Sequence, residues 1–332
     1  MFDPPREIDQ TTAEQLARTL LDHRRHAATD DPASFSTWTI EPAARGQNGV
    51  VWHASCEGEQ ELAIKISVVD ERRRGEHEFT VTRHLSRLGH DVAPRPIVLT
   101  NDGDLAACVS SWCPGLSLVD GLDWDSERWS EIVSLLARVH EVAYDGLPRA
   151  TPGASIGEQL ARAQAYADRA GRGRFHFLAT AVRRKIGDQL LNAQDQGLVH
   201  ADTNLSNIVA DGDTIRLVDW EYSGIGDPCC DVADLCTSPS ASGMPDQLAA
   251  RLIREHAMAL GREELVARTN AFVIVLLAYW CARVGAPPLE KKLTDVEVDP
   301  RRDARTRIDH YRDRLGQALE LNRSLVDRLL ER

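Results

Sequence analysis

Hydrophobic and polar residues follow two different periods along the chain, and the change of period divides it into two parts. Residues 11–27 space their apolar side chains at helical intervals and open with threonines that can cap a helix, which predicts a leading surface helix. Residues 35–42, 49–58 and 61–69 are short, rich in β-branched and aromatic residues, and separated by glycine and polar turns. They predict three antiparallel strands.

A helix and a hairpin complete the first part. Residues 70–89 place apolar side chains at near-helical spacing and end on Gly89, a residue type that favours the end of a helix. Residues 94–100 and 104–112 flank the turn NDGD and predict a hairpin. Residues 35–112 therefore predict a five-stranded antiparallel sheet with one main helix inserted after the third strand.

The second part is mostly helical. Amphipathic stretches predict helices at 126–143, 155–170, 177–194, 245–260, 262–284 and 303–329. The only strand-like segments expected here are NIVAD and TIRLVDW, on either side of the turn DGD. The apolar run AFVIVLLAYWCA is too short to span a bilayer and predicts a buried helix. The fold class is therefore α+β, with an N-terminal lobe at 1–112 and a helical C-terminal lobe at 113–332, joined near WCPGLSL.

Composition and charge are those of a soluble globular protein. The chain has 332 residues, 42% of them hydrophobic and 27% charged. The formal net charge of -12 argues against a nucleic-acid partner, and it favours either attraction of a cationic substrate or simple solubility. The seven cysteines form no C-x-x-C pair and the N-terminus lacks a secretion signal, so we expect a cytoplasmic protein without a zinc site or disulfides. We expect no membrane partner, and a monomer or a dimer.

The stretch LVHADTNLSNIVADGDTIRLVDWEY carries the candidate chemistry. Transfer of a phosphoryl group to an alcohol needs a carboxylate that takes the hydroxyl proton, and oxygen ligands for magnesium. Asp202 suits the first role, while Asn207 and Asp219 suit the second. The ring of His200 is expected to hold the two metal-binding segments in register by bonding the backbone around Asp219. The alternative is that Asp and Asn stand here only because they favour turns.

Two upstream features favour the phosphoryl-transfer interpretation. Lys65 interrupts the apolar strand LAIKIS, and the next helix carries Glu78, so the pair matches the Lys–Glu device that holds nucleotide phosphates in kinases. The turn AARGQNGVVW, with Gly46, Asn48 and Gly49, allows the backbone to approach phosphates closely, although a glycine turn alone is a weak signal.

Taken in chain order, the glycine turn, Lys65, Glu78 and the segment with Asp202, Asn207 and Asp219 resemble the corresponding residues of the aminoglycoside phosphotransferase and choline kinase superfamily. That superfamily shares the two-lobed protein-kinase-like fold. HADTNLSN stands where that superfamily has its catalytic loop, and DWEYSGIGDPCCDVADL resembles its segment from the metal-binding Asp into a helix. The resemblance covers about residues 38–285. Protein kinases carry H-R-D, D-F-G and A-P-E, whereas this chain has H-A-D, D-W-E and no counterpart of the third motif, which argues against protein substrates.

The resemblance implies a role for each matching residue. It makes Asp202 the catalytic base. It makes Lys65 and Glu78 the pair that binds the nucleotide phosphates, and Asn207 and Asp219 the two Mg²⁺ ligands. The backbone of Ser111, Trp112 and Cys113 is expected to take the base of ATP, or of GTP. Asp231 is expected to brace the catalytic loop or to cap the next helix.

The acceptor is less determined by the sequence. Glu221 and Tyr222 follow the metal-binding Asp, and an acid with an aromatic group suits an ammonium, so we expect a small cationic acceptor, foremost an aminoglycoside-type antibiotic. A metabolite kinase acting on choline, thiamine or an amino sugar is the first alternative. The second alternative is a non-catalytic nucleotide-binding pseudokinase. The complete set of site residues argues against it. Tyr279 and Trp280 are either part of an aromatic acceptor site or, more commonly for such residues, core.

Overall fold

The computed structural model describes residues 6–27, 33–45, 49–120, 123–151, 155–192, 195–283 and 304–320, together with Val326 and Leu330. The chain forms two compact units. The first contains the residues up to Leu116 and the returning segment Val209–Glu221, and the second contains Ser117–Ile208 and most of the chain after Tyr222. Each unit has its own core.

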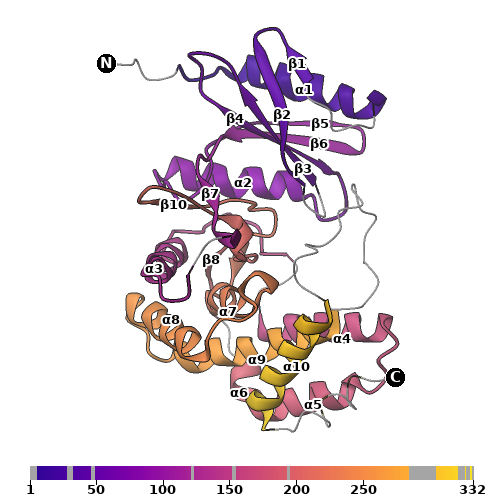
Figure 1. Cartoon of the computed structure of the whole chain (residues 1–332), viewed down its shortest axis with the longest axis vertical. Coiled ribbons are helices and arrows are strands. Elements are labelled where there is room, and N and C mark those ends of the chain that lie inside the picture. Colours follow the sequence, from indigo (N-terminus) through magenta and orange to yellow (C-terminus); the bar gives the residue numbers. More distant parts are fainter. Residues whose placement is uncertain are drawn as a thin grey trace. The chain divides into compact units, whose positions relative to one another are not determined.

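An antiparallel sheet forms the centre of the first unit (Figure 1). The five predicted strands are present, and a short sixth strand, β1, extends the sheet to the order β1-β2-β3-β4-β6-β5. The strands are β1 (Ala33–Phe35), β2 (Trp38–Arg45), β3 (Gly49–Ser55), β4 (Leu62–Val68), β5 (Pro96–Asp102) and β6 (Leu105–Ser111).

Helices α1 (Gln10–Ala27) and α2 (Arg74–Arg87) lie on opposite sides of this sheet (Figure 1). Because side chains alternate along a strand, Ile64 and Ile66 join the apolar cluster under α1, whereas Lys65 points to the side of α2. We predicted α1 as a surface helix beside a sheet with one main helix. Its apolar stripe is fully buried against the sheet while Gln15, Arg18 and Asp22 are exposed, which confirms a surface helix with one buried face.

The hairpin of β9 (Ile208–Asp211) and β10 (Thr214–Leu217) belongs to the first unit, although the sequence placed it in the helical part. Its contacts explain the assignment: the Leu217 amide donates to the Val92 carbonyl at 2.9 Å, and Arg216 pairs with Asp91. The short strand β7 (Leu116–Ser117) completes a small sheet in the order β10-β9-β7.

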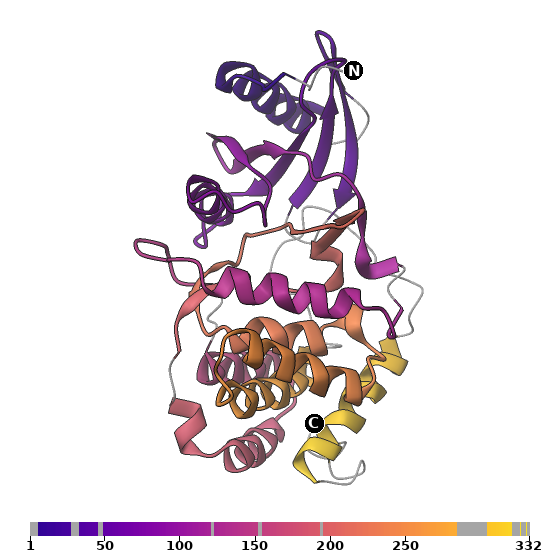
Figure 2. The ribbon, with the colours of Figure 1, turned by 90° about the vertical axis from the view of Figure 1, so that its left-hand side faces the viewer.

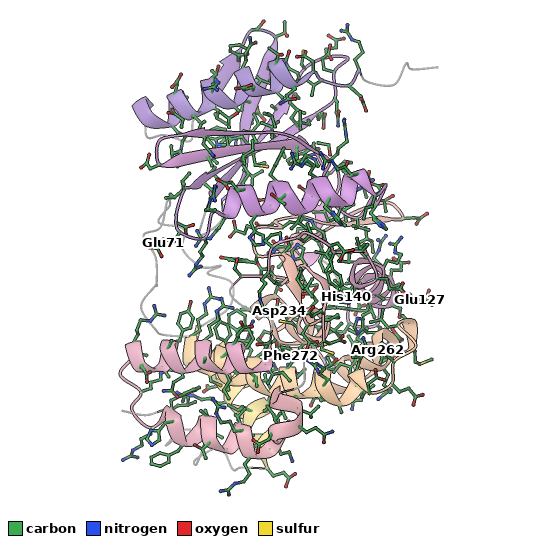
Figure 3. The ribbon with its side chains drawn as sticks, turned by 180° about the vertical axis from the view of Figure 1, so that it is seen from behind. Glu71, Glu127, His140, Asp234, Arg262 and Phe272 are labelled. Carbon is green, nitrogen blue, oxygen red and sulfur yellow. The ribbon has the colours of Figure 1, made fainter. Side chains whose placement is uncertain are left out.

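The second unit is built around α9 (Leu265–Arg283), which packs against helices from several parts of the chain (Figure 2). Phe272, labelled in Figure 3, is one of its fully buried side chains. By length and composition α9 could cross a membrane, but most of its apolar stretch is buried among the other helices, which confirms the predicted buried helix. The other helices are α3 (Arg128–His140), α4 (Ile156–Arg169), α5 (Phe175–Ile186), α6 (Asp188–Asn192), α7 (Cys229–Thr237), α8 (Asp246–Ala259) and α10 (Ala304–Leu319).

Two local features differ from the prediction. The helix predicted at 177–194 is broken at Gly187, whose φ of 81° ends α5 before α6 begins. The prediction of only two strand-like segments in this part was wrong, because β8 (Gly197–Val199) and β11 (Gly224–Gly226) form an antiparallel pair. Each of these strands has only three residues, too few to show a period of two.

Candidate active site

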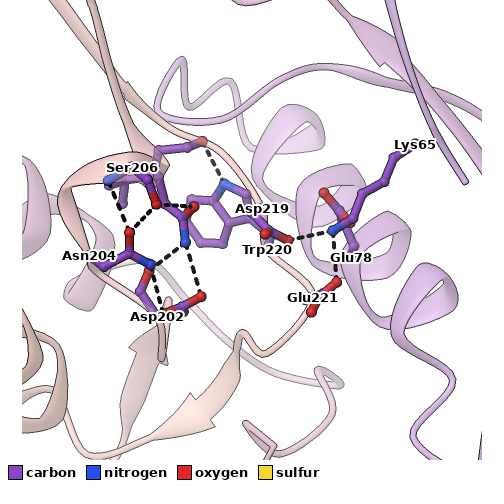
Figure 4. Close-up of polar contacts among 10 residues, drawn as sticks. Lys65, Glu78, Asp202, Asn204, Ser206, Asp219, Trp220 and Glu221 are labelled. Atoms are coloured by element: carbon purple, nitrogen blue, oxygen red, sulfur yellow. Dashed lines mark hydrogen bonds and ion pairs between the residues drawn. The ribbon is translucent and has the colours of Figure 1, made fainter. Parts of the chain in front are cut away.

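The predicted catalytic loop runs from β8 into the 3-10 turn η2 (Leu205–Asn207), and it fixes the carboxylate of Asp202. Asn204 Nδ2 donates to Asp202 Oδ1 at 3.0 Å (Figure 4). Asn207 Nδ2 donates to Asp202 Oδ2, also at 3.0 Å. Asn207 Nδ2 also donates to the Asp202 carbonyl at 2.9 Å. One amide on each oxygen holds the carboxylate in a single orientation, which is what a positioned proton acceptor requires.

The same bonds orient the amide of Asn207. Because its Nδ2 atom donates twice to Asp202, its Oδ1 atom faces away from that residue; among the described residues it is approached by Ser206 Oγ alone, at 3.5 Å. A neutral amide oxygen in this position fits the predicted role as a magnesium ligand.

Asn204 was missed by the sequence reasoning. Its Oδ1 atom accepts from the Ser206 amide at 3.0 Å and so caps η2, while its Nδ2 atom holds Asp202. The sequence feature that could have identified Asn204 is its position two residues after Asp202. Asp and Asn side chains at such short spacings often form hydrogen bonds within their own turn.

The backbone of the loop is anchored by Asp231, which is fully buried on α7. Its two carboxylate oxygens accept from the amides of His200 and Ala201, each at 2.8 Å. Ala201 has a φ of 64°, an uncommon value for a residue other than glycine, and Asp231 holds this conformation directly. The predicted bracing by Asp231 is therefore seen in the structure.

The alternative prediction, that Asp231 caps the next helix, does not match the geometry. Asp231 lies within the first turn of α7, and the residue whose carboxylate accepts from a helix-start amide is Asp227, at 3.1 Å from the Cys229 nitrogen. His200 is fully buried, and its predicted ring bond to the backbone around Asp219 stays a prediction.

In the first unit, Lys65 is surrounded by three carboxylates (Figure 4). Its Nζ atom lies 2.8 Å from Glu78 and 2.9 Å from Glu221, and it also pairs with Asp219. Burial acts to lower the pKa of Lys65, but the charges of Asp219, Glu221 and Glu78 outweigh it and hold the pKa well above its usual value. These carboxylates therefore favour the charged ammonium, and the predicted Lys65–Glu78 pair is present.

Glu221 takes a place that the sequence did not suggest. We predicted that it faces the acceptor, but its side chain is only 3% exposed and is paired with Lys65. Tyr222 is half-buried, and its carbonyl accepts from the Thr151 amide at 3.0 Å. Contact of either side chain with an acceptor stays a prediction.

The charges around Lys65 suit a divalent cation. Three carboxylates and one ammonium leave a net charge of two negative, and Asp219 is placed by a φ of 65°, the left-handed conformation that Ala201 also adopts. Within the described residues there is no cluster of three or more His, Cys, Asp or Glu that could hold a metal alone. Magnesium bound through one or two protein oxygens plus substrate phosphates needs no such cluster, so the donor set fits that mode.

At the predicted hinge, two of the three backbone amides are already used. The Ser111 amide donates to the Arg95 carbonyl and the Trp112 amide to the Glu61 carbonyl, both at 2.9 Å. In the described part of the chain no hydrogen bond is formed by the Cys113 amide. Of the three predicted residues, Cys113 is therefore the one whose N–H suits a nucleotide base.

The sheet itself explains why residue 49 is a glycine. A Cβ atom at this position would lie 2.6 Å from the Ile66 carbonyl oxygen, so only glycine lets β3 approach β4 closely here. Its predicted contact with phosphates stays a prediction. The predicted phosphate-binding residues Gly46 and Asn48 lie outside the described residues.

A family model described as the phosphotransferase enzyme family matches residues 39–266. The chain belongs to this family. A search of curated proteins gives no match. The match and the kinase-like α+β fold confirm the resemblance predicted from HADTNLSN and DWEYSGIGDPCCDVADL, and the chain is a small-molecule phosphotransferase that acts on hydroxyl groups.

Solved structures show the same fold at low identity. A choline/ethanolamine kinase family protein from Mesorhizobium loti is 17% identical, with 97% of this chain and 98% of that chain covered and a TM-score of 0.61. A choline kinase from Cryptosporidium parvum is 13% identical, with the same coverage and TM-score. A macrolide 2'-phosphotransferase from Brachybacterium faecium is 18% identical, with 83% and 100% covered and a TM-score of 0.54.

Proposed function

We propose that the phosphotransferase is a magnesium-dependent kinase that moves the γ-phosphate of ATP, or of GTP, to a hydroxyl group of a small acceptor. The observation that carries this proposal is the carboxylate of Asp202, which is held through one oxygen by Asn204 and through the other by Asn207. A surface turn would not need a carboxylate fixed from both sides on a loop whose backbone is itself anchored in the core.

Asp202 would orient the acceptor hydroxyl and take its proton as the bond to phosphorus forms. Asn204 and Asn207 keep the carboxylate aimed, so the main contribution of the loop is positioning. Lys65, kept charged by its three carboxylates, would bind the nucleotide phosphates. The predicted metal ligands Asn207 and Asp219 would hold Mg²⁺, which supplies charge neutralisation on the phosphates when bound.

Two substitutions separate these roles. Asp202→Ala should lower turnover by about 10²- to 10⁴-fold and leave nucleotide affinity nearly unchanged, because it removes only the proton acceptor. Asp219→Ala should weaken magnesium-dependent nucleotide binding, measured by titration calorimetry with and without Mg²⁺. The exposed Asp145→Asn is a matched control that should change neither. Normal turnover by Asp202→Ala would refute the assignment of the base.

The acceptor classes expected from the sequence are an aminoglycoside-type antibiotic and a metabolite such as choline, thiamine or an amino sugar. A coupled assay of ADP release over both groups distinguishes them. Nucleotide binding without any ADP release would instead support the nucleotide-binding pseudokinase. The expectation of a cationic acceptor rested on Glu221, on Tyr222 and on the net charge of -12. Because Glu221 is paired with Lys65, Tyr222 and the net charge are the two observations that still support it.

A further inference from the structure

The 3-10 turn η2, which ends on Asn207, is held by hydroxyl groups from two distant parts of the chain. The Ser117 Oγ atom, in β7, lies 3.1 Å from the Leu205 carbonyl oxygen and 3.3 Å from that of Ser206. In the short turn η3 (Pro239–Ala241), the Ser240 Oγ atom accepts from the Leu205 amide at 2.9 Å. Ser117 lies 88 residues before Leu205 and Ser240 lies 35 residues after it, so neither contact follows from local sequence.

A turn of three residues depends on such outside contacts. The hydrogen bonds of a 3-10 turn have poorer geometry than those of an α-helix, and short turns of this kind are weak by themselves. Within η2, the Asn207 amide donates to the Asn204 carbonyl at 3.0 Å, and the Ile208 amide donates to the Leu205 carbonyl. The two serine hydroxyls reinforce these bonds, one on the carbonyl side of the turn and one on its amide side.

The backbone before Ser117 is shaped for this contact. Gly115 has a φ of 109°, and a Cβ atom there would lie 2.1 Å from the Ala210 carbonyl oxygen in β9. Only glycine tolerates both this conformation and this close approach. The glycine therefore lets β7 pair with β9, the strand that directly follows η2, and this pairing brings the Ser117 hydroxyl to the turn.

The side chain of Asn207 depends on where the turn holds it. Its Nδ2 atom orients the Asp202 carboxylate, and its Oδ1 atom is the predicted magnesium ligand. Both functions require the side chain of Asn207 to leave the backbone in one direction. Because the Ser206 carbonyl and the Asn207 nitrogen belong to the same peptide plane, a hydroxyl bonded to that carbonyl restricts rotation of the plane that carries Asn207.

The contact of Ser117 differs from the local bonds that serine and threonine often form. Ser134 on α3 and Thr180 on α5 each donate to a carbonyl four residues earlier, at 2.8 Å, which is an ordinary helix contact. The carbonyls near the Ser117 hydroxyl lie 88 and 89 residues away, and they belong to the two residues that precede Asn207. Its position therefore points to a role in the geometry of that residue.

We propose that Ser117 is a positioning residue for phosphoryl transfer. Its hydroxyl holds the peptide in front of Asn207, and it so fixes the direction of the side chain that orients Asp202 and is proposed to bind Mg²⁺. Ser240 supports the same turn from its amide side. This inference rests on the proposed kinase function and extends it, because it adds a residue outside the predicted catalytic loop to the groups that set the geometry of the site.

Two substitutions of similar shape isolate the hydroxyl. Ser117→Thr keeps the hydroxyl and adds a methyl group, whereas Ser117→Val has the same branched shape without a hydroxyl. Both residue types favour strands, so β7 should form in each variant. The first readout is binding of a non-hydrolysable ATP analogue, measured by calorimetry over a series of Mg²⁺ concentrations. It gives the Mg²⁺ midpoint, the concentration that produces half of the gain in nucleotide affinity, and it requires no acceptor.

We expect Ser117→Val to raise the Mg²⁺ midpoint about 3- to 10-fold, the effect of losing one hydrogen bond. Ser117→Thr should restore the wild-type midpoint, and nucleotide affinity without Mg²⁺ should be the same in all three proteins, because Ser117 acts through the metal ligand. Thr180→Val is the matched control, since it removes an exposed hydroxyl from a backbone carbonyl on α5. It should leave the midpoint unchanged.

A second readout needs neither metal nor nucleotide. The amides of Leu205 and Asn207 are hydrogen-bonded in the turn, so their hydrogen exchange reports how often η2 opens. Ser117→Val should accelerate the exchange of both amides about 3- to 10-fold, and Ser117→Thr should not. Exchange in the buried helix α9 should be unchanged, which distinguishes a loosened turn from a general loss of stability.

The possible results separate this inference from the kinase proposal. If Ser117→Val and Ser117→Thr have the same Mg²⁺ midpoint, shifted or not, the hydroxyl is not responsible and the inference is wrong, although the chain remains a kinase. The inference is also wrong if Ser117→Val accelerates exchange in α9 as much as in η2, because the contact is then one of general stability. If the wild type binds no magnesium–nucleotide complex and releases no ADP, the kinase proposal fails and this inference fails with it.

Discussion

The Nε2 atom of His140 lies 3.0 Å from the Asp231 carboxylate, and both side chains are completely buried. The same carboxylate accepts from the amides of His200 and Ala201, so α3 and α7 together fix the backbone just before Asp202. A buried carboxylate with three donors is strongly held in its charged form, and the pKa of Asp231 is lowered although burial acts to raise it, because the hydrogen bond and charge of His140 and the groups of His200 outweigh the burial.

Asp231→Asn should therefore be costly even though it keeps the shape of the side chain. Its amide nitrogen would face one of three donors, which leaves a buried N–H group without an acceptor. We expect the free energy of unfolding to fall by about 3–5 kcal/mol, the range for removing one partner of a buried charged pair, together with a loss of turnover. Urea unfolding measures the first. The exposed Asp145→Asn should change stability by less than about 0.5 kcal/mol.

The network of Asp231 extends to a second histidine and gives a pH dependence. Burial, followed by the nearby His140, lowers the pKa of His256 to about 3. His140 Nδ1 lies 2.8 Å from His256 Nε2, and the other ring nitrogen of His256 is buried without a hydrogen-bond partner in the described structure, so a second proton there would have no acceptor.

His256 should make the protein less stable as the pH falls from about 6.5 to about 3. In this window the unfolded chain takes up the proton and the folded chain does not, so stability decreases by up to about 1.4 kcal/mol per pH unit. Urea midpoints between pH 7 and pH 4 measure the slope. His256→Gln should flatten it, whereas the exposed His176→Gln should not. Equal slopes in both variants would show that His256 is not the group responsible.

The sequence predicted the elements that local pattern controls. Lys65 stood out as a charge within the apolar strand LAIKIS, and Glu78 as the acid that begins the apolar-periodic part of the next helix; the two are paired in the structure. The spacing of Asp202 and Asn207 likewise fits within a single loop, so their hydrogen bonds follow from local geometry.

Long-range contacts could not be read in the same way. Glu221 reaches Lys65 across 156 residues of sequence, and no period links the two. The stacking of Arg162 and Arg283 on Tyr279 depends on how α4 crosses α9, whereas the sequence showed only an arginine on an amphipathic helix and another at a helix end. The apolar stripe of α1 could be predicted from the sequence, but the sheet against which it packs could not.

Lys65→Met should destabilise the first unit far more than the loss of one ion pair would suggest. It leaves the carboxylates of Glu78, Asp219 and Glu221 close together without their common cation. We expect a loss of about 3–5 kcal/mol in the free energy of unfolding. Lys185→Met is the matched control, because Lys185 pairs with Glu320 at a site where these side chains are 39% and 80% exposed, and it should cost at most about 1 kcal/mol. A similar loss in both variants would contradict the arrangement around Lys65.

Ala201→Gly tests whether the catalytic loop stores backbone strain. A left-handed conformation costs a residue with a Cβ atom about 1–2 kcal/mol, and the greater freedom of glycine in the unfolded chain returns about 0.5–1 kcal/mol of that. The variant should therefore be as stable as the wild type or more stable by up to about 1.5 kcal/mol. Ala161→Gly, on the exposed side of α4, should instead lose about 1 kcal/mol. If both variants lose the same amount in urea unfolding, Ala201 carries no strain and Asp231 holds the loop against no opposing force.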